Sequence, residues 1–209
     1  MPARLLDEID HWCAGRWWHV RIPLLAFLAW IWIRHAQDPL YQSLFKGLNL
    51  GIHELGHYVF GPFGEMPGAL GGSLLQCLVP LIAAAMFVRQ RDWFAVFFAF
   101  GWLGTNFFEV ATYAGDAVAM SLPLVTPGGG HPLHDWNYFL GNYGWLRHTE
   151  AVAAWHRTAA HGSMIVSLAG GGWVVSRMMA AAMRAHRAVA RRARLAAAET
   201  ARETSRPAV

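Results

Sequence analysis

Residues 68–88 read GALGGSLLQCLVPLIAAAMFV, a run without a single charged side chain. At about 1.5 Å per residue, a helix over this run is about 30 Å long, the thickness of the hydrocarbon core of a bilayer. The run therefore predicts a membrane-spanning helix. Gly68, Gly71 and Gly72 stand near its start, and glycines in such a helix let a second helix approach closely.

The composition of the whole chain agrees with a membrane protein. Of its 209 residues, 55% are hydrophobic and only 14% are charged, whereas about 25% are charged in a soluble protein. Eleven Trp and twelve Phe favour the same class, because aromatic side chains gather at membrane interfaces. The mean hydropathy of +0.26 is mild, since a polar tail and a long polar loop dilute the apolar segments.

Working outward from residues 68–88, we expect four more membrane segments. They cover residues 17–33, 40–63, 93–114 and 158–176. The first would be only about 25 Å long, so an interfacial or re-entrant helix remains an alternative for it. The segment 40–63 carries several polar residues, and polar groups inside a span tend to be functional. The predicted fold is an all-α, polytopic integral membrane helix bundle of about five spans.

This pattern predicts that the chain is divided into three parts. Residues 1–16 form an N-terminal interfacial segment without the small-residue cleavage site of a signal peptide. Residues 17–176 form the membrane domain. Residues 177–209 form a basic helical tail whose end, from Glu199, is disordered. Five arginines of this tail fall on one helical stripe: Arg177, Arg184, Arg187, Arg191 and Arg194.

The formal net charge of +4 is concentrated in that tail. The basic stripe has no interleaved stacking residues or recognised nucleic-acid motif, so we expect no nucleic-acid partner. We expect anionic lipid at the tail instead. The excess of Lys and Arg places the tail and the turn containing Arg89 and Arg91 on the cytoplasmic side. With five spans the basic N-terminus would then lie outside, a conflict that an N-terminus lying on the membrane would remove.

Residues 53–57 read HELGH, which is the H-E-x-x-H pattern. Residues four apart share one face of a helix, so the imidazoles of His53 and His57 can bind one zinc ion. Glu54 can accept a proton from the water that the zinc activates. Gly51 and Gly56 open space around these side chains. The alternative is a structural polar cluster that joins helices.

A catalytic zinc site usually has a third protein ligand and one open position. The candidates for that ligand are Glu109, Asp116, Asp135, His131 and His134. Estimated depth in the membrane favours Glu109, because Asp116 would lie about 20 Å beyond the midpoint of its helix. Asp116 and Asp135 remain alternatives. The loop residues His131, His134 and Asp135 could also form a second metal site or a gate for water and substrate.

Three further polar residues are candidates for supporting roles. Asn106, Glu109, Tyr113 and Asp116 recur at spacings of three, four and three, which places them on one helical stripe. Asn106 or Tyr113 could donate a hydrogen bond to the oxyanion formed during hydrolysis, or the stripe could simply join helices. Gln76 could orient a ligand or the substrate backbone, or bond a neighbouring helix.

The stretch NLGIHELGHYVFGPFGE, residues 49–65, resembles the site-2-protease-like intramembrane zinc metallopeptidases. The resemblance is specific over residues 47–76. It implies zinc bound by His53 and His57, Glu54 as the catalytic base, and cleavage of a transmembrane or membrane-proximal peptide. In that family the third ligand is an Asp in an Asn-x-x-Pro … Leu-Asp-Gly pattern. The nearest counterpart runs from Asn106 to Asp116 but lacks the proline and the Leu-Asp-Gly, and a true match would favour Asp116.

Together these observations predict a membrane-embedded zinc metalloendopeptidase that hydrolyses peptide bonds of membrane or membrane-proximal substrates. The expected location is a bacterial inner (cytoplasmic) membrane, and the sequence is silent on the oligomeric state. Two other classes remain open: a membrane protein that handles metal ions or protons, and a catalytically inactive protease-like scaffold. The first alternative would tolerate Glu54→Gln, and the second would bind metal weakly.

Overall fold

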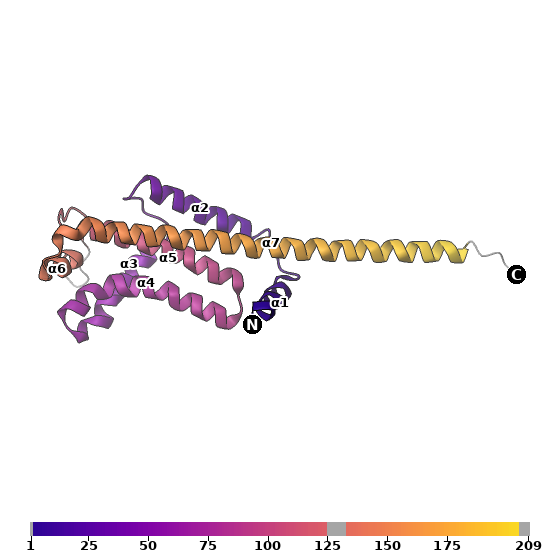
Figure 1. The fold of residues 1–209 in the computed structure, drawn as a ribbon, viewed down its shortest axis with the longest axis horizontal. Helices are drawn as coiled ribbons and strands as arrows, with labels where there is room; N and C mark the ends of the chain where they lie inside the picture. The colour runs from indigo at the N-terminus through magenta and orange to yellow at the C-terminus, as the bar shows by residue number, and fades with distance from the viewer. Residues whose placement is uncertain (1, 125–132, 205–209) are drawn as a thin grey trace. The chain divides into compact units, whose positions relative to one another are not determined.

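The computed structural model describes residues 2–124 and 133–204. Within these ranges the chain is all-helical and contains no strand, which confirms the all-α part of the predicted fold class (Figure 1). The helices are α1 (Pro2–Cys13), α2 (Arg21–Gln37), α3 (Lys46–Phe60), η1 (Gly61–Phe63), α4 (Glu65–Gln90), α5 (Trp93–Gly115), α6 (Asp135–Asn142), η2 (Leu146–His148) and α7 (Thr149–Thr204).

Three helical segments in the described ranges are long and apolar enough to cross a membrane. They are α4, α5 and the segment from Leu146 to Glu199, which contains most of α7. The prediction of about five spans is not confirmed. The reason is length: α2 has 17 residues and α3 has 15, so they are about 25 Å and 22 Å long, shorter than the hydrocarbon core.

Contacts divide the chain into two compact units, residues 23–171 and residues 1–22 with 172–209. The larger unit contains α2 to α6 and the first part of α7. The smaller unit contains α1 and the rest of α7, so it joins most of the predicted N-terminal segment to the predicted tail.

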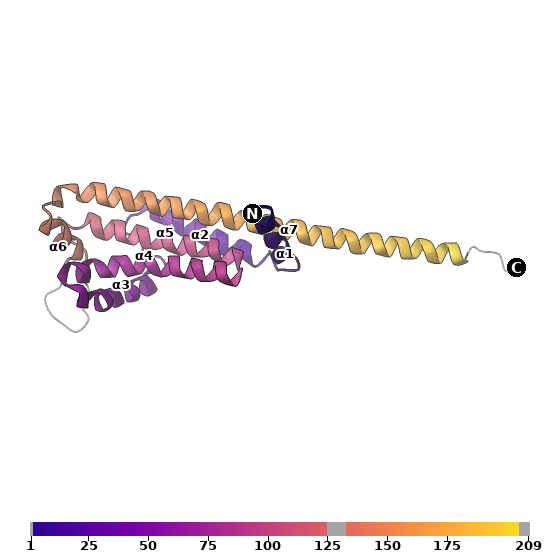
Figure 2. The same ribbon diagram turned by 60° about the horizontal axis from the view of Figure 1, so that its bottom comes forward.

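The larger unit is built on the hairpin of α4 and α5, which run side by side in opposite directions (Figures 1 and 2). Arg91 closes α4 in the left-handed region, at φ 58°. The Asp92 carboxylate then accepts a hydrogen bond from the Ala95 amide, 3.1 Å away, and caps the start of α5. The charged pair Arg89 and Arg91 therefore marks one end of the hairpin.

Helix α3 packs against α4 at a contact made by glycines. A Cβ atom on Gly56 would overlap the Gly71 carbonyl oxygen, and one on Gly71 would come within 2.6 Å of the Gly56 carbonyl oxygen. This confirms that Gly71 and Gly72 let a second helix approach closely. The outer face of α3 is apolar and exposed, as Leu48, Leu55 and Tyr58 show.

Helix α2 joins α5 and the first part of α7 through an apolar cluster of Ile31, Phe108, Ala160 and Met164. Close approach again requires a glycine, because a Cβ on Gly101 would come within 2.7 Å of the Leu28 side chain.

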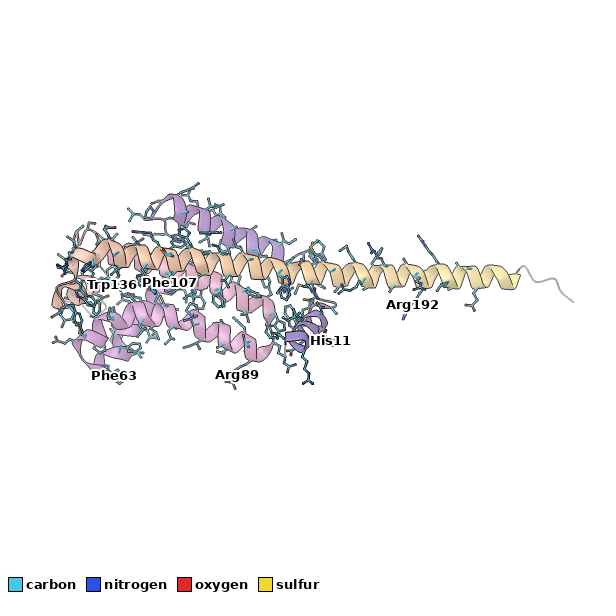
Figure 3. All side chains as sticks on the ribbon, in the orientation of Figure 1. His11, Phe63, Arg89, Phe107, Trp136 and Arg192 are labelled. Atoms are coloured by element: carbon cyan, nitrogen blue, oxygen red, sulfur yellow. The ribbon has the colours of Figure 1, made fainter. Side chains whose placement is uncertain are left out.

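The short helix α6 lies at the end of the hairpin opposite Arg89, where Figure 3 shows its residue Trp136. The Trp136 ring packs on Val110, Ala114 and Leu140, and its Nε1–H donates to Ser73 Oγ on α4 at 3.1 Å. These contacts hold α6 against both helices of the hairpin, and they determine the position of Asp135, the first residue of α6.

The smaller unit is joined by an ion pair between Asp10 on α1 and Arg177 on α7, with one Arg177 Nε to Asp10 Oδ1 distance of 2.6 Å. The hydrogen bond from Arg177 holds the pKa of Asp10 below its usual value. Cys13 is buried beside the Val174 carbonyl. Further along α7, Arg184, Arg187, Arg191 and Arg194 are exposed.

Candidate metal centre

The two histidines of the motif lie one turn apart on α3 and point at the same acid. His53 Nε2 is 3.2 Å and His57 Nε2 is 3.4 Å from Asp135 Oδ2. One ligand atom from each of the three side chains lies within 4.8 Å of the others. His53 and Asp135 are buried, and His57 is partly exposed. The fold thus brings a His-His-Asp cluster together from α3 and α6.

Hydrogen bonds at the far side of each ring determine which nitrogen faces Asp135. His57 Nδ1 lies 2.8 Å from the Gly68 carbonyl oxygen, and a carbonyl can only accept, so Nδ1 carries the proton. His53 Nδ1 lies 3.1 Å from Gln76 Oε1; this oxygen is again an acceptor. In the neutral form of each ring these bonds leave the Nε2 lone pair on the side of Asp135, which is the tautomer that metal binding requires.

Two of the three separations between the ligand atoms are compatible with a tetrahedral zinc site. Zinc–nitrogen distances of about 2.0–2.1 Å place neighbouring ligand atoms about 3.3 Å apart. The distances of 3.2 and 3.4 Å agree with that value. Two neutral imidazoles and one carboxylate are also a common donor set for zinc. A protonated histidine paired with Asp135 would give the same distances without a metal ion. Metal analysis distinguishes this ion pair from a zinc site.

Asp135 is held by its own helix and by α5. Tyr113 O–H donates to Asp135 Oδ2 at 3.1 Å, and the Asp135 amide donates to Tyr113 Oη at 3.1 Å. Tyr113 is therefore already bonded to the carboxylate, which makes it a residue that positions Asp135 rather than a free oxyanion donor. This differs from one of the roles predicted from the sequence.

A second group of contacts fixes the start of α6 from the loop side. His134 Nδ1 accepts from the Asn137 amide at 3.3 Å and caps the helix. His134 Nε2 lies 3.4 Å from Asp116 Oδ2. Burial acts to raise the pKa of Asp116, but hydrogen bonds from Ser121 and Leu122 outweigh it, so the pKa of Asp116 lies below its usual value. Asp116 and His134 thus support Asp135 and do not join the cluster.

Glu109 is not among the three side chains of the cluster. Its Oε1 accepts from Asn49 Nδ2 at 3.0 Å and its Oε2 accepts from Gln76 Nε2 at 3.0 Å. Trp102 Nε1 donates to Asn49 Oδ1 at 2.8 Å and completes the chain of bonds. The structure therefore places Glu109 behind Gln76, where it orients the amide that bonds His53. The depth estimate had favoured Glu109 as ligand because it did not anticipate that α6 packs back onto the hairpin.

The cluster opens on a cavity of about 1110 Å³. His53, His57, Asp135 and Glu54 all line it, so the predicted base shares a space with the three ligand candidates. Apolar residues from three segments supply much of the remaining wall: Leu40, Leu50, Leu122, Leu124 and Leu133. The cavity is therefore large enough for an extended peptide, and the three ligand candidates and Glu54 lie on its wall.

The other sequence predictions have mixed outcomes. Gln76 contacts His53, as one of its two proposed roles requires. Asn106 is fully buried, donates to the Trp102 carbonyl on its own helix and does not line the cavity. The structure therefore does not bring Asn106 to the site. His131 lies outside the described residues.

Sequence reasoning missed the place of Asn49 in the site and the contact between Gly72 and His53. Asn49 is four residues before His53 on the same helical face, a spacing that could have marked it. Gly72 faces the imidazole of His53, where a Cβ would come within 2.5 Å of Nε2. No pattern in the sequence pairs residues 53 and 72, since that contact depends on how α3 and α4 cross.

Comparisons of this chain with protein-family models, with curated proteins and with solved structures found no match.

Proposed function

We propose that this chain is a membrane-embedded zinc-dependent peptidase, related to the site-2-protease-like metallopeptidases that its motif resembles. The observation that carries the proposal is the convergence of His53 Nε2 and His57 Nε2 on one oxygen of Asp135, at 3.2 and 3.4 Å. In this proposal His53, His57 and Asp135 hold the zinc ion, and Asp135 takes the place that the sequence had given first to Glu109.

A bound zinc ion would supply a water molecule with a pKa near 7 and polarise the substrate carbonyl. The chain's own residues perform the remaining work. Glu54 lines the same cavity and accepts the proton of the attacking water, then delivers it to the leaving amine. Gln76 and the Gly68 carbonyl hold the two imidazoles in the tautomer that leaves Nε2 free. Tyr113 holds Asp135.

The membrane setting limits the substrate. Helices α4 and α5 are long and apolar enough to cross a bilayer, and the cavity lies against both, with Ala69, Gln76, Glu109 and Val110 among its lining residues. Peptides from membrane or membrane-proximal proteins are therefore the substrates of the proposal. The bacterial inner membrane as the location, and anionic lipid at the arginine stripe of α7, belong to the same proposal.

Elemental analysis of the detergent-purified protein tests the proposal. We expect about one zinc per chain in the wild type and little in His57→Ala. In Glu54→Gln we expect zinc to be retained and peptide cleavage to be lost. Cleavage that survives Glu54→Gln, or a wild type that takes up no zinc after reloading, would show that the proposal is wrong.

One observation favours the alternative of metal or proton handling. Glu109 lies in the span α5, bonded to Asn49 and Gln76, and acids inside membrane helices often mark ion or proton pathways. This alternative predicts ion flux into proteoliposomes that requires Glu109 and persists in Glu54→Gln. The peptidase proposal predicts no such flux.

A further inference from the structure

The cavity beside the metal centre has a positive charge at one place. Among the described residues that line it, Lys46 is the one lysine or arginine. Lys46 begins α3, and His53 follows seven residues later, two turns along the same face. Measured along the helix axis, Lys46 is about 10 Å from His53 and about 16 Å from His57. The cation therefore lies to one side of the cluster and within the same space.

Lys46 is not held in a direct ion pair. It forms no salt bridge in the part of the chain that the structure describes. Glu109 interacts with it electrostatically, but without direct contact, because the Glu109 oxygens accept hydrogen bonds from Asn49 and Gln76. The ammonium group of Lys46 can therefore still bind an anionic group of a ligand that enters this partly apolar cavity.

The opposite side of the cluster carries an acid. Glu65 begins α4 and lines the cavity, where it accepts a hydrogen bond from Tyr138 Oη at 2.7 Å. Glu65 lies one turn before Gly68 on α4, and the Gly68 carbonyl oxygen bonds His57. Glu65 therefore lies on the far side of His57 from Lys46. An extended peptide lying along α3 would therefore meet a cation on one side of the cluster and an anion on the other. This polarity favours a chain whose carboxyl end points toward Lys46.

Given the proposed peptidase function, we propose that Lys46 binds the free C-terminal carboxylate of a peptide substrate. The enzyme then removes short pieces from carboxyl ends. At about 3.3–3.6 Å per extended residue, the span from Lys46 to the cluster corresponds to a released piece of about three or four residues. In the reaction the oxygen of water bonds to the carbonyl carbon, the C–N bond breaks, and Glu54 passes the proton of that water to the leaving amine.

Two fluorescently labelled ten-residue peptides of the same alanine- and leucine-rich sequence test this assignment, one ending in a carboxylate and the other in a carboxamide. For the wild type we expect cleavage three or four residues from the free end and a kcat/KM at least tenfold lower for the carboxamide. Lys46→Met and Lys46→Gln should reduce that ratio to below twofold, whereas Lys46→Arg should keep it. Similar zinc content and similar cleavage of the carboxamide show that the variants are folded.

Equal cleavage of the two peptides by the wild type, or an unchanged preference in Lys46→Met and Lys46→Gln, would overturn the role of Lys46 and leave the peptidase function intact. Binding to the Glu54→Gln protein, measured by fluorescence anisotropy, separates the two proposals. There we expect the carboxylate peptide to bind at least fivefold tighter, and the difference to vanish when Lys46→Met is added. If that holds while the wild type cleaves neither peptide, the peptidase function fails and the carboxylate site stands. Equal binding of both peptides overturns the site.

Discussion

The two ring nitrogens of His53 lead to two different carboxylates, and the regions around these carboxylates differ in construction. Nε2 faces Asp135 directly, and Nδ1 faces the amide of Gln76, which bonds Glu109. On the Nε2 side, Asp135 comes from the short helix α6 and shares one oxygen with both imidazoles beside an open cavity. On the Nδ1 side, Glu109 lies in the span α5 and has both oxygens bonded by the amides of Asn49 and Gln76. The first carboxylate is placed to bind a ligand, and the second is fully used in holding neighbours.

This difference shows that an acid inside a membrane helix is not automatically a ligand. Burying a charge is costly unless hydrogen bonds satisfy it, and Glu109 meets that requirement with side chains from α3 and α4. Asp135 accepts a hydrogen bond from Tyr113, and a bound cation would satisfy the rest of its charge. Substitutions that treat the two carboxylates alike should therefore have unequal effects.

The largest effect is expected for Asp135→Ala, which removes the oxygen on which both histidines converge. We expect zinc affinity to fall by more than the roughly 100-fold that marks the upper range for residues outside the ligand shell. Competition with a chromophoric chelator measures the affinity. A fall of less than tenfold would exclude Asp135 as a ligand.

The second largest effect is expected for Gly72→Ala, because the added Cβ would come within 2.5 Å of His53 Nε2. The imidazole must move away from Asp135, so zinc affinity should fall at least tenfold. Gly51→Ala is the matched control. Nothing lies within 4 Å of its added Cβ, and alanine in a helix interior gains about 0.5–1 kcal/mol over glycine. Equal zinc affinity in the two variants would contradict the placement of α3 against α4.

For Glu109→Gln we expect a decrease in zinc affinity of about tenfold, at the lower end of the range for residues that orient a ligand. An amide cannot accept at both of its atoms, so one of the bonds from Asn49 and Gln76 is lost and Gln76 no longer holds His53 firmly. Glu65→Gln makes the same chemical change in the same cavity, against Tyr138, and should leave zinc affinity within twofold. A loss after Glu109→Gln as large as that after Asp135→Ala would restore Glu109 as a ligand.

The smallest effect is expected for Asp116, which contacts His134 at the start of α6, and it concerns thermal stability. The pKa of Asp116 is lowered in the folded protein, so its stabilising contribution is present above the unfolded pKa of about 3.9. That contribution is lost as the pH falls through the lower folded value. We expect Asp116→Asn to lower the melting temperature at pH 7 by a few degrees, and the gap from wild type to shrink near pH 3. The exposed Asp7→Asn should show no such gap; a gap independent of pH would contradict the charge effect.

Much of the fold and part of the site could be predicted from local patterns. The apolar run at residues 68–88 indicates the span α4 because length and composition determine whether a helix can cross a bilayer. The spacing of His53 and His57 indicates a shared face because the helical repeat guarantees it. Both inferences depend on residues close together in the chain.

The features that were not predicted depend on tertiary packing. Asp135 was named from the sequence only as an alternative ligand. It lies beside the histidines because Trp136 bonds Ser73 and packs on α5, which no spacing rule indicates. The segment containing α2 was predicted as a span from its apolar run, and the segment containing α3 because polar groups inside a span tend to be functional. Neither pattern shows where a helix begins and ends. Pro39 and Leu40 precede α3 as non-helical chain, so α3 begins six residues later than the predicted segment.

The 15 residues of α3 have a consequence for the surrounding lipid. In the proposed membrane placement, α3, with Leu48 and Leu55 exposed on its outer face, presents about 22 Å of helix to a hydrocarbon layer of about 30 Å. Hydrophobic mismatch of this kind makes the adjacent lipid tails compress or tilt, at a cost of a fraction of a kcal/mol per ångström. In that placement the bilayer is thinner next to α3 than next to α4 and α5, and the path of water and of a peptide substrate to His53 and His57 is shorter.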